Sequence, residues 1–129
     1  MKHKVGQKIT ALLLIVMMSM TFNAFAQDEL KRVTTAEAEA MIENGDIIII
    51  DVRDAVRYGN GHIKGAINIP RTTDVSVYEA KLKKDDKVLL VCGAGVSSRI
   101  VGEMLIEKGF TNVTDILGGM MDWQGSVEK

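Results

Sequence analysis

Two short segments of this chain are apolar at every position, and they constrain the fold more than any other feature. Residues 47–50 are four isoleucines, and residues 88–91 read Val-Leu-Leu-Val. A strand with one face in water alternates apolar and polar side chains, whereas an unbroken apolar run indicates a strand that is covered on both faces. The chain is therefore predicted to build a parallel sheet with helices on both faces, because that arrangement buries such strands.

The segments between these runs show helical patterns and short breaks. Thr34 and Glu37 form a capping box, which predicts the start of one helix. Further helices are predicted around 75–82, from 98 onward with a stop at Gly109, and briefly after the glycine pair at 118–119, with short strands at 66–69 and 113–117. A chain of 129 residues with alternating strands and helices favours a single α/β domain.

Residues 1–26 are interpreted as a secretory signal peptide ahead of a domain at residues 27–129. Three lysines give the segment a positive start, residues 9–20 form an apolar centre, and Ala-Phe-Ala at 24–26 is a cleavage pattern. The alternative is an uncleaved membrane anchor, but the apolar centre is at the short limit, since a span takes about 20 residues. The expected location is therefore periplasmic or secreted, with no stable membrane association after cleavage.

Cleavage would also change the charge of the protein. It removes Lys2, Lys4 and Lys8 from sixteen Lys and Arg residues and leaves all seventeen Asp and Glu residues, so the mature net charge is −4. A nucleic-acid-binding domain needs a basic face. The composition therefore argues against a nucleic-acid partner.

Cys92 is the single cysteine of the chain. Exported proteins normally use cysteines in pairs, so a single one is a buried apolar residue, an intermolecular partner or a reactive thiol. It directly follows the apolar run at 88–91, and ligands of open α/β sheets bind beyond the carboxyl ends of the strands.

The loop after Cys92 is built from small residues, namely Gly93, Ala94, Gly95, Val96 and Ser97. Such a loop ahead of a helix can turn its backbone N–H groups inward, and the helix N-terminus adds partial positive charge. Both would favour a thiolate. An inert buried cysteine before an ordinary turn is the alternative on these residues alone.

From Asp51 onward the chain resembles the rhodanese domain family. The resemblance rests on Asp51-Val52-Arg53 with Tyr58 and the segment 61–70, on the strand at 88–91 that leads into Cys92-x-x-Gly95, and on Leu117-Gly118-Gly119 with Trp123. These segments stand in the family's order and spacing over essentially all of the mature chain. The resemblance implies a five-stranded parallel sheet flanked by helices.

The resemblance also implies a persulfide mechanism. The Cys92 thiolate would take sulfur from a small anionic donor, thiosulfate first of all, and pass it to a thiol or to cyanide. The N–H groups of residues 93–97 would stabilise the anionic sulfur. A partner protein could serve as the acceptor, and neither a metal nor an organic cofactor is required.

The sequence departs from the family pattern near the cysteine. Ser97 stands five positions after Cys92, where many thiosulfate-using relatives carry arginine or lysine. The loop resembles that of mercaptopyruvate-using relatives, so a mercaptopyruvate-type donor is the alternative. Arg99, two positions further on, and Arg57, where the family usually has an acid, are candidate accessory cations.

Asp51, Arg53 and His62 are expected to have structural roles. The pair Asp51 and Arg53 is placed to fix the loop after a strand through charge-assisted hydrogen bonds. His62 is expected to anchor a loop and not to act as a general base. His3 falls in the predicted signal peptide, so no cluster of ligands for a metal is expected.

Two other functions stay open on these residues. The domain could bind a partner, or carry sulfur to it, without catalysis, or Cys92 could form mixed disulfides in a redox role. The retained cysteine and its glycine-containing loop favour the enzyme, whereas Ser97 is the main feature against it.

Overall fold

The computed structural model describes residues 29–129, so the predicted signal peptide lies outside the described residues. Within residues 29–129, no helix combines the length and the apolar character that crossing a membrane requires.

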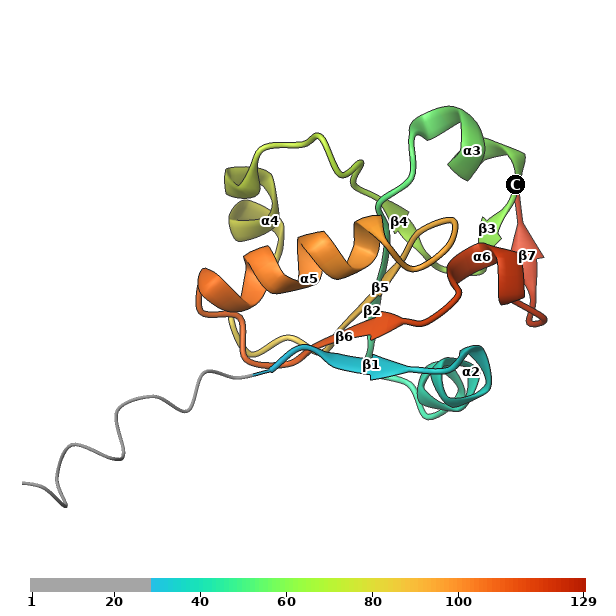
Figure 1. Ribbon diagram of the computed structural model, residues 1–129, viewed down its shortest axis with the longest axis horizontal. Coiled ribbons are helices and arrows are strands. Elements are labelled where there is room, and N and C mark those ends of the chain that lie inside the picture. Colours follow the sequence, from blue (N-terminus) through green and yellow to red (C-terminus); the bar gives the residue numbers. More distant parts are fainter. Residues whose placement is uncertain (1–28) are drawn as a thin grey trace, which may run out of the picture.

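Five parallel strands form the central sheet, as predicted (Figure 1). Their order across the sheet is β1 (Lys31–Val33), β6 (Val113–Ile116), β5 (Val88–Val91), β2 (Ile48–Asp51) and β4 (Ile67–Asn68). The middle strand, β5, pairs with β2 and β6, and Leu89 lies opposite Ile49 and Thr114. Because all the strands are parallel, the segments that follow β5, β2 and β4 leave the same edge of the sheet.

Helices cover both faces of this sheet, which confirms the predicted fold class. The helices are α2 (Thr35–Glu43), α3 (Ala55–Asn60), α4 (Val75–Lys81), α5 (Ser97–Glu107) and α6 (Gly119–Asp122). Figure 1 shows α4 and α5 on one side of the sheet and α2 on the other.

The apolar run of β5 divides its side chains between two hydrophobic cores. Val88 and Leu90 pack in the core that α4 and α5 cover, and Leu89 and Val91 pack in the core that α2 covers. All four are at most 1% exposed. Burial of each such side chain contributes roughly 1.5–3 kcal/mol, so the strand that ends at Cys92 is firmly held.

The helix ends that the sequence marks are formed by the expected residues. Thr34 Oγ1 accepts a hydrogen bond from the Glu37 N–H at 3.2 Å, and a Glu37 carboxylate oxygen accepts one from the Thr34 N–H at 2.9 Å. After α5, Gly109 adopts a φ of +89°, and the Phe110 N–H donates to the Leu105 carbonyl at 3.1 Å. The left-handed turn at Gly109 thus lets Phe110 fold back into the core.

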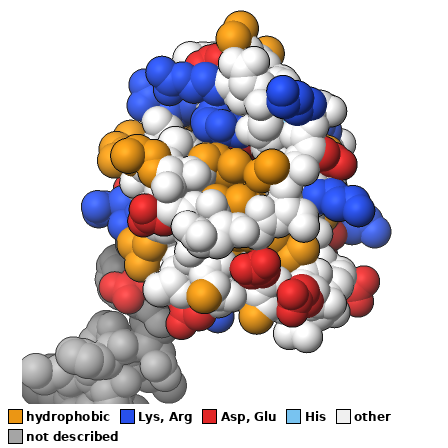
Figure 2. Space-filling view, turned by 90° about the vertical axis from the view of Figure 1, so that its right-hand side faces the viewer, with side chains coloured by type: hydrophobic (Ala, Val, Ile, Leu, Met, Phe, Trp, Pro, Cys, Tyr) orange, Lys and Arg blue, Asp and Glu red, His pale blue; other side chains and the backbone are white. Residues whose placement is uncertain are grey.

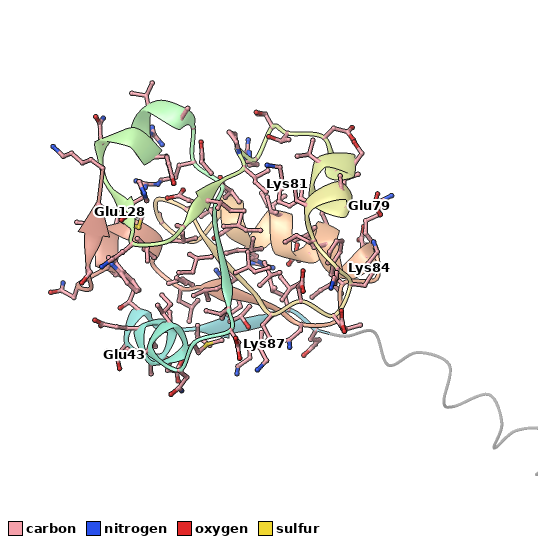
Figure 3. The ribbon with its side chains drawn as sticks, turned by 180° about the vertical axis from the view of Figure 1, so that it is seen from behind. Glu43, Glu79, Lys81, Lys84, Lys87 and Glu128 are labelled. Carbon is pink, nitrogen blue, oxygen red and sulfur yellow. The ribbon has the colours of Figure 1, made fainter. Side chains whose placement is uncertain are left out.

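The structure also contains short strands that the sequence does not mark. The strands β3 (His62–Ile63) and β7 (Val127–Glu128) form a separate antiparallel pair, and β1 is only three residues long. Elements this short carry no readable periodicity. Glu128, labelled in Figure 3, also holds the turn after β3, since its carboxylate accepts from the Gly65 N–H at 3.0 Å.

Candidate active site

Cys92 follows β5 directly, and the start of α6 holds the backbone at this point. The N–H groups of Met120 and Met121 donate to the carbonyls of Cys92 and Gly93 at 2.8 and 2.9 Å. A Cβ at Gly119 would collide with the Cys92 carbonyl oxygen, and its φ is +55°. The glycine pair before α6 therefore allows the close approach that fixes the strand end.

The Cys92 sulfur lies almost out of solvent and accepts two hydrogen bonds. The residue is 3% exposed. Its Sγ accepts from the Gly95 N–H at 3.1 Å and from the Ser98 hydroxyl at 3.2 Å. Burial alone would raise the pKa of the Cys92 thiol, but hydrogen bonds from Ser98, Gly95 and Ala94 together lower the pKa below its ordinary value. The site therefore favours a thiolate.

The loop between Cys92 and α5 is tightly constrained. Gly95 has a φ of +82°, and a Cβ there would lie 3.0 Å from the Gly118 nitrogen and 3.2 Å from the Ile116 carbonyl oxygen. The Gly95 carbonyl accepts a hydrogen bond from Arg32 Nη2 at 2.7 Å. α5 begins at Ser97, one residue earlier than predicted, and no side chain caps its N-terminus. The first N–H groups of the helix are thus left beside the cysteine loop.

A pocket of about 280 Å³ opens over the cysteine. Its walls come from the segments after three neighbouring strands, β2, β4 and β5, and they include the arginines Arg53, Arg57 and Arg71. Figure 2 shows Lys and Arg side chains gathered on the upper part of the face that α3, α6 and β7 form. The pocket walls thus carry three arginines and one carboxylate, that of Asp54.

The three arginines differ in their contacts. Arg53 is held by Asp51 and by the Gly61 carbonyl, at 2.7 and 2.8 Å. Arg57 lies 3.4 Å from Asp54 in a largely exposed pair. Arg71 Nη1 donates to the Ser97 hydroxyl at 3.4 Å. The loop has no cation at position 97, but Arg71, from the segment after β4, places a positive charge at the Ser97 hydroxyl.

Hydrogen bonds and ring stacking hold the side chains of Asp51, Arg53 and His62 in place. Both Asp51 carboxylate oxygens accept from the Arg53 side chain. The His62 ring stacks on the Tyr58 ring with centroids 3.8 Å apart, and its Nδ1 lies 2.9 Å from the Tyr58 carbonyl oxygen. None of the three is a hydrogen-bond partner of the sulfur.

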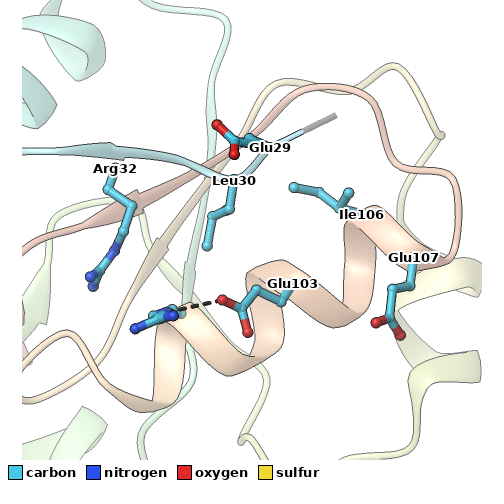
Figure 4. Close-up of a pocket in the computed structure, with 7 residues that line it drawn as sticks. Glu29, Leu30, Arg32, Glu103, Ile106 and Glu107 are labelled. Atoms are coloured by element: carbon cyan, nitrogen blue, oxygen red, sulfur yellow. Dashed lines mark hydrogen bonds and ion pairs between the residues drawn. The ribbon is translucent and has the colours of Figure 1, made fainter. Parts of the chain in front are cut away.

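Arg99 lies in another part of the surface. It donates to Glu103 at 2.9 Å and contributes, with Arg32, to a larger pocket of about 570 Å³ beside β1 and α5 (Figure 4). Cys92 does not line that pocket, so the chemistry of the sulfur belongs to the smaller one. Of the two accessory cations considered from the sequence, the structure brings Arg57 to the cysteine pocket and leaves Arg99 outside it.

Sequence reasoning did not identify Arg71, Ser98, Arg32 or Asp115. Arg71 follows Pro70 at the end of a predicted strand. Because ligands bind at the carboxyl ends of parallel strands, this position could have identified Arg71 as a site residue. Arg32 Nε donates to Asp115 at 2.7 Å, across 83 positions of the sequence, and no local pattern reveals such a pair. Across the described residues, His, Cys, Asp and Glu form no group of three or more that could hold a metal ion.

Comparison with known proteins places this geometry in one family. The family model of the rhodanese-like domain matches residues 34–126. The thiosulfate sulfurtransferase GlpE of Coxiella burnetii is 34% identical over 94 residues, which cover 73% of this chain and 87% of that protein. The GlpE of Haemophilus influenzae is 33% identical over 93 residues, with coverage of 72% and 87%.

A solved structure agrees with these sequence matches. A rhodanese-like domain protein from Staphylococcus aureus superposes with a TM-score of 0.69 at 30% identity, covering 77% of this chain and 97% of that one. Residues 34–126, which the family model matches, contain the cysteine loop and every strand of the central sheet except β1. The chain therefore belongs to the rhodanese-like domain family and is a rhodanese-type sulfurtransferase.

Proposed function

We propose that Cys92 carries sulfur as a persulfide between a small anionic donor and a nucleophilic acceptor. The observation that carries this proposal is the Cys92 sulfur itself, which accepts two hydrogen bonds at the base of an arginine-lined pocket. A thiolate is the reactive form of a cysteine, and hydrogen bonds from Ser98 and from the loop backbone favour it by lowering the pKa of Cys92.

The first half-reaction loads the enzyme. The Cys92 thiolate attacks the outer sulfur of thiosulfate, a new S–S bond forms, and the S–S bond of thiosulfate breaks. Its electron pair leaves with sulfite, and the negative charge of the enzyme moves to the outer sulfur of the persulfide. In this proposal, the N–H groups of residues 93–97 stabilise that charge, in the manner of an oxyanion hole.

The second half-reaction unloads it. A thiolate or cyanide attacks the outer sulfur, the persulfide S–S bond breaks, and its electron pair returns to Cys92. No metal or organic cofactor takes part in either step. Sulfur leaves with the acceptor, and the enzyme is ready for another donor.

Thiosulfate is the proposed donor because the pocket offers cations for a dianion. Within residues 29–129, the Arg57 side chain is held by an exposed ion pair that water screens, so it can turn toward a ligand. Arg71 stands at Ser97 and can supply the charge that the loop lacks. The curated relatives are named for thiosulfate, whereas mercaptopyruvate, with a single carboxylate, is the alternative donor.

A partner protein with an exposed thiol is a further acceptor that suits the surroundings of the loop. Val96 in the loop is 65% exposed, and Met121 beside it is 79% exposed. Exposed apolar side chains near the loop are suited to contact a protein surface. We further propose that the chain is exported with removal of residues 1–26, which the mass of the secreted form would test.

The deciding experiment is the intact mass of the protein before and after incubation with thiosulfate, and separately with 3-mercaptopyruvate. A gain of one sulfur atom that cyanide reverses, and that Cys92→Ser lacks, is the expected result. If neither donor adds sulfur while the thiol can still be alkylated, the persulfide proposal is wrong and a binding module takes its place.

The role of the arginines has its own test. Arg57→Gln and Arg71→Gln should each raise the KM for thiosulfate by roughly tenfold, the effect of losing one charge-assisted contact. Arg99→Gln is the matched control, because Arg99 lies in the other pocket. An equal rise of the KM in Arg99→Gln would show that general charge, and not the pocket, attracts the donor.

A further inference from the structure

Behind the cysteine, buried polar groups connect the sulfur to the edge of the sheet. Ser98 donates its hydroxyl proton to Cys92 Sγ, while Arg32 bridges the Asp115 carboxylate and the Gly95 carbonyl, each at 2.7 Å. Ser98 and Asp115 are both fully buried, at 0% exposure. The strands β1 and β6, the helix α5 and the loop after β5 therefore meet at this cluster.

One atom of the cluster has no partner. Asp115 Oδ1 is buried and accepts no hydrogen bond from any residue in the described part of the chain. Ser98 belongs to α5, which packs on β6, the strand of Asp115. Burial raises the pKa of the Asp115 carboxyl, and the Ser98 side chain and Arg32 oppose that rise. A hydroxyl has one proton, so Ser98 can serve either the sulfur or the carboxylate, but not both at once.

The next step rests on the proposed persulfide chemistry of Cys92. In the free enzyme, Sγ carries the negative charge and is a strong acceptor for the Ser98 proton. In the persulfide, Sγ is a neutral sulfur with two covalent bonds, and the charge sits on the outer sulfur in the pocket. Hydrogen bonds to an ionised acceptor are about twice as strong as those to a neutral one, so loading weakens the bond between Ser98 and the sulfur.

We propose that Asp115 is a positioning residue of the sulfur-transfer cycle, which receives the Ser98 hydroxyl proton while Cys92 carries the extra sulfur. The hydroxyl then satisfies Oδ1, which stabilises the loaded state. When an acceptor attacks the outer sulfur, the hydroxyl turns back and stabilises the departing Cys92 thiolate. Only hydrogen bonds rearrange, the proton stays on Ser98, and Arg32 keeps the carboxylate in place.

Asp115→Asn is the informative variant because it keeps the shape of the side chain. The amide oxygen can still accept from Arg32, while its NH₂ group faces Ser98 and donates to the hydroxyl oxygen. The Ser98 proton is then held on Cys92 in both states. Persulfide formation should become slower and its discharge by cyanide faster, each by roughly threefold to tenfold, the effect of one hydrogen bond.

Single-turnover measurements of the two half-reactions supply the readout. A role limited to stabilising the loop would slow both steps, whereas the proposal requires changes of opposite sign. Asp51→Asn is the matched control, since Asp51 is an equally buried aspartate that pairs with an arginine, and the hydrogen-bond partners of the sulfur are Gly95 and Ser98 instead. It should not produce this opposite pair of changes.

A double-mutant cycle tests whether Asp115 acts through Ser98. On a Ser98→Ala background, Asp115→Asn should change neither half-reaction further. Equal slowing of both steps, or a split that survives in Ser98→Ala, would overturn the proposal. If the wild type never gains sulfur, the persulfide function itself has failed. If the wild type loads normally but substitution of Asp115 changes neither half-reaction, only the role of Asp115 has failed.

A measurement on the wild type covers the case in which Asp115→Asn does not fold. The carboxyl ¹³C signal of Asp115 should shift when thiosulfate loads the enzyme, and most of that shift should be lost in Ser98→Ala. An Asp115 signal that does not move on loading would refute the proposal without any variant of that residue.

Discussion

Two buried aspartates at the ends of central strands each pair with an arginine, yet they are built differently. Asp51 at the end of β2 pairs with Arg53 two residues on, and both its oxygens accept from that side chain. Asp115 in β6 pairs with Arg32 in β1 through one oxygen, and the other oxygen has no partner among residues 29–129.

We call the Asp51–Arg53 pair closed, because both carboxylate oxygens have partners. The Asp115–Arg32 pair is open, because one carboxylate oxygen has no partner among the described residues. The first pair is satisfied by residues next to each other in sequence, and it fixes the loop after β2 whatever the cysteine does. The second pair leaves an acceptor beside the hydroxyl that serves the sulfur. A buried carboxylate oxygen without a donor is costly, so its presence next to the reactive group points to a second arrangement of the hydroxyl.

The largest expected effect comes from breaking the closed pair. Arg53→Ala leaves a fully buried carboxylate without its cation, and the free energy of unfolding should fall by about 3–5 kcal/mol. Urea denaturation measures it. Arg57→Ala removes an exposed arginine from a surface pair that water screens, so it should lower the free energy of unfolding far less. Equal losses would mean that the closed pair is no more than a surface contact.

Breaking the open pair should cost less. The Arg32 side chain is 30% exposed against 10% for Arg53, so water already screens part of the interaction. Arg32→Ala should lower the free energy of unfolding by about 2–3 kcal/mol and loosen the Gly95 carbonyl. The control is Arg99→Ala, which breaks only a surface pair with Glu103. A loss larger than that of Arg53→Ala would reverse the comparison.

The hydroxyl beside the open pair can be tested by alkylation. The native pKa of the Cys92 thiol is lowered by hydrogen bonds to the thiolate, so Ser98→Ala should move the midpoint of iodoacetamide alkylation upward by roughly one pH unit. Ser97→Ala removes the neighbouring hydroxyl, which faces Arg71, and should leave the midpoint nearly unchanged. A shift of equal size in both variants would contradict the assignment of Ser98.

The smallest effect concerns stability and pH. Because burial raises the pKa of Asp115 in the folded state, its contribution to stability is fully present below the pKa of the unfolded chain. That contribution is lost as the pH rises through the unfolded and then the folded pKa. Asp115→Asn should therefore flatten this part of the stability profile and leave the free energy of unfolding at neutral pH within about 1 kcal/mol of the wild type. Denaturation curves from pH 3 to 8 measure it, and a steeper profile in the variant would contradict it.

The sequence predicts the parts of this molecule that rest on repeated or local patterns. The unbroken apolar runs predict the buried strands, and the capping box predicts the start of α2. The position of Cys92 directly after an apolar run predicts that it lies at the ligand-binding edge of the sheet. The pair Asp51 and Arg53 was visible because its members are two positions apart. Each of these features depends on neighbours along the chain.

The parts that the sequence did not reveal depend on register and on distant contacts. Which of two adjacent serines faces the sulfur depends on the first turn of α5, and a shift of one residue in that start exchanges their directions. Arg32 stands in a strand of three residues, too short for a pattern, and its partner lies 83 positions away. Arg71 reaches Ser97 only because β4 and β5 flank β2.

The position of β1 at the edge of the sheet has a consequence for motion. Among residues 29–129, β1 pairs with β6 alone, and it is three residues long, so local unfolding should release it at a lower free energy than the central strands. Each opening withdraws Arg32 from the Gly95 carbonyl. The amides of the cysteine loop should therefore exchange with deuterium at a rate that follows the fraying of the first strand, although the strand that bears the cysteine is among the most protected.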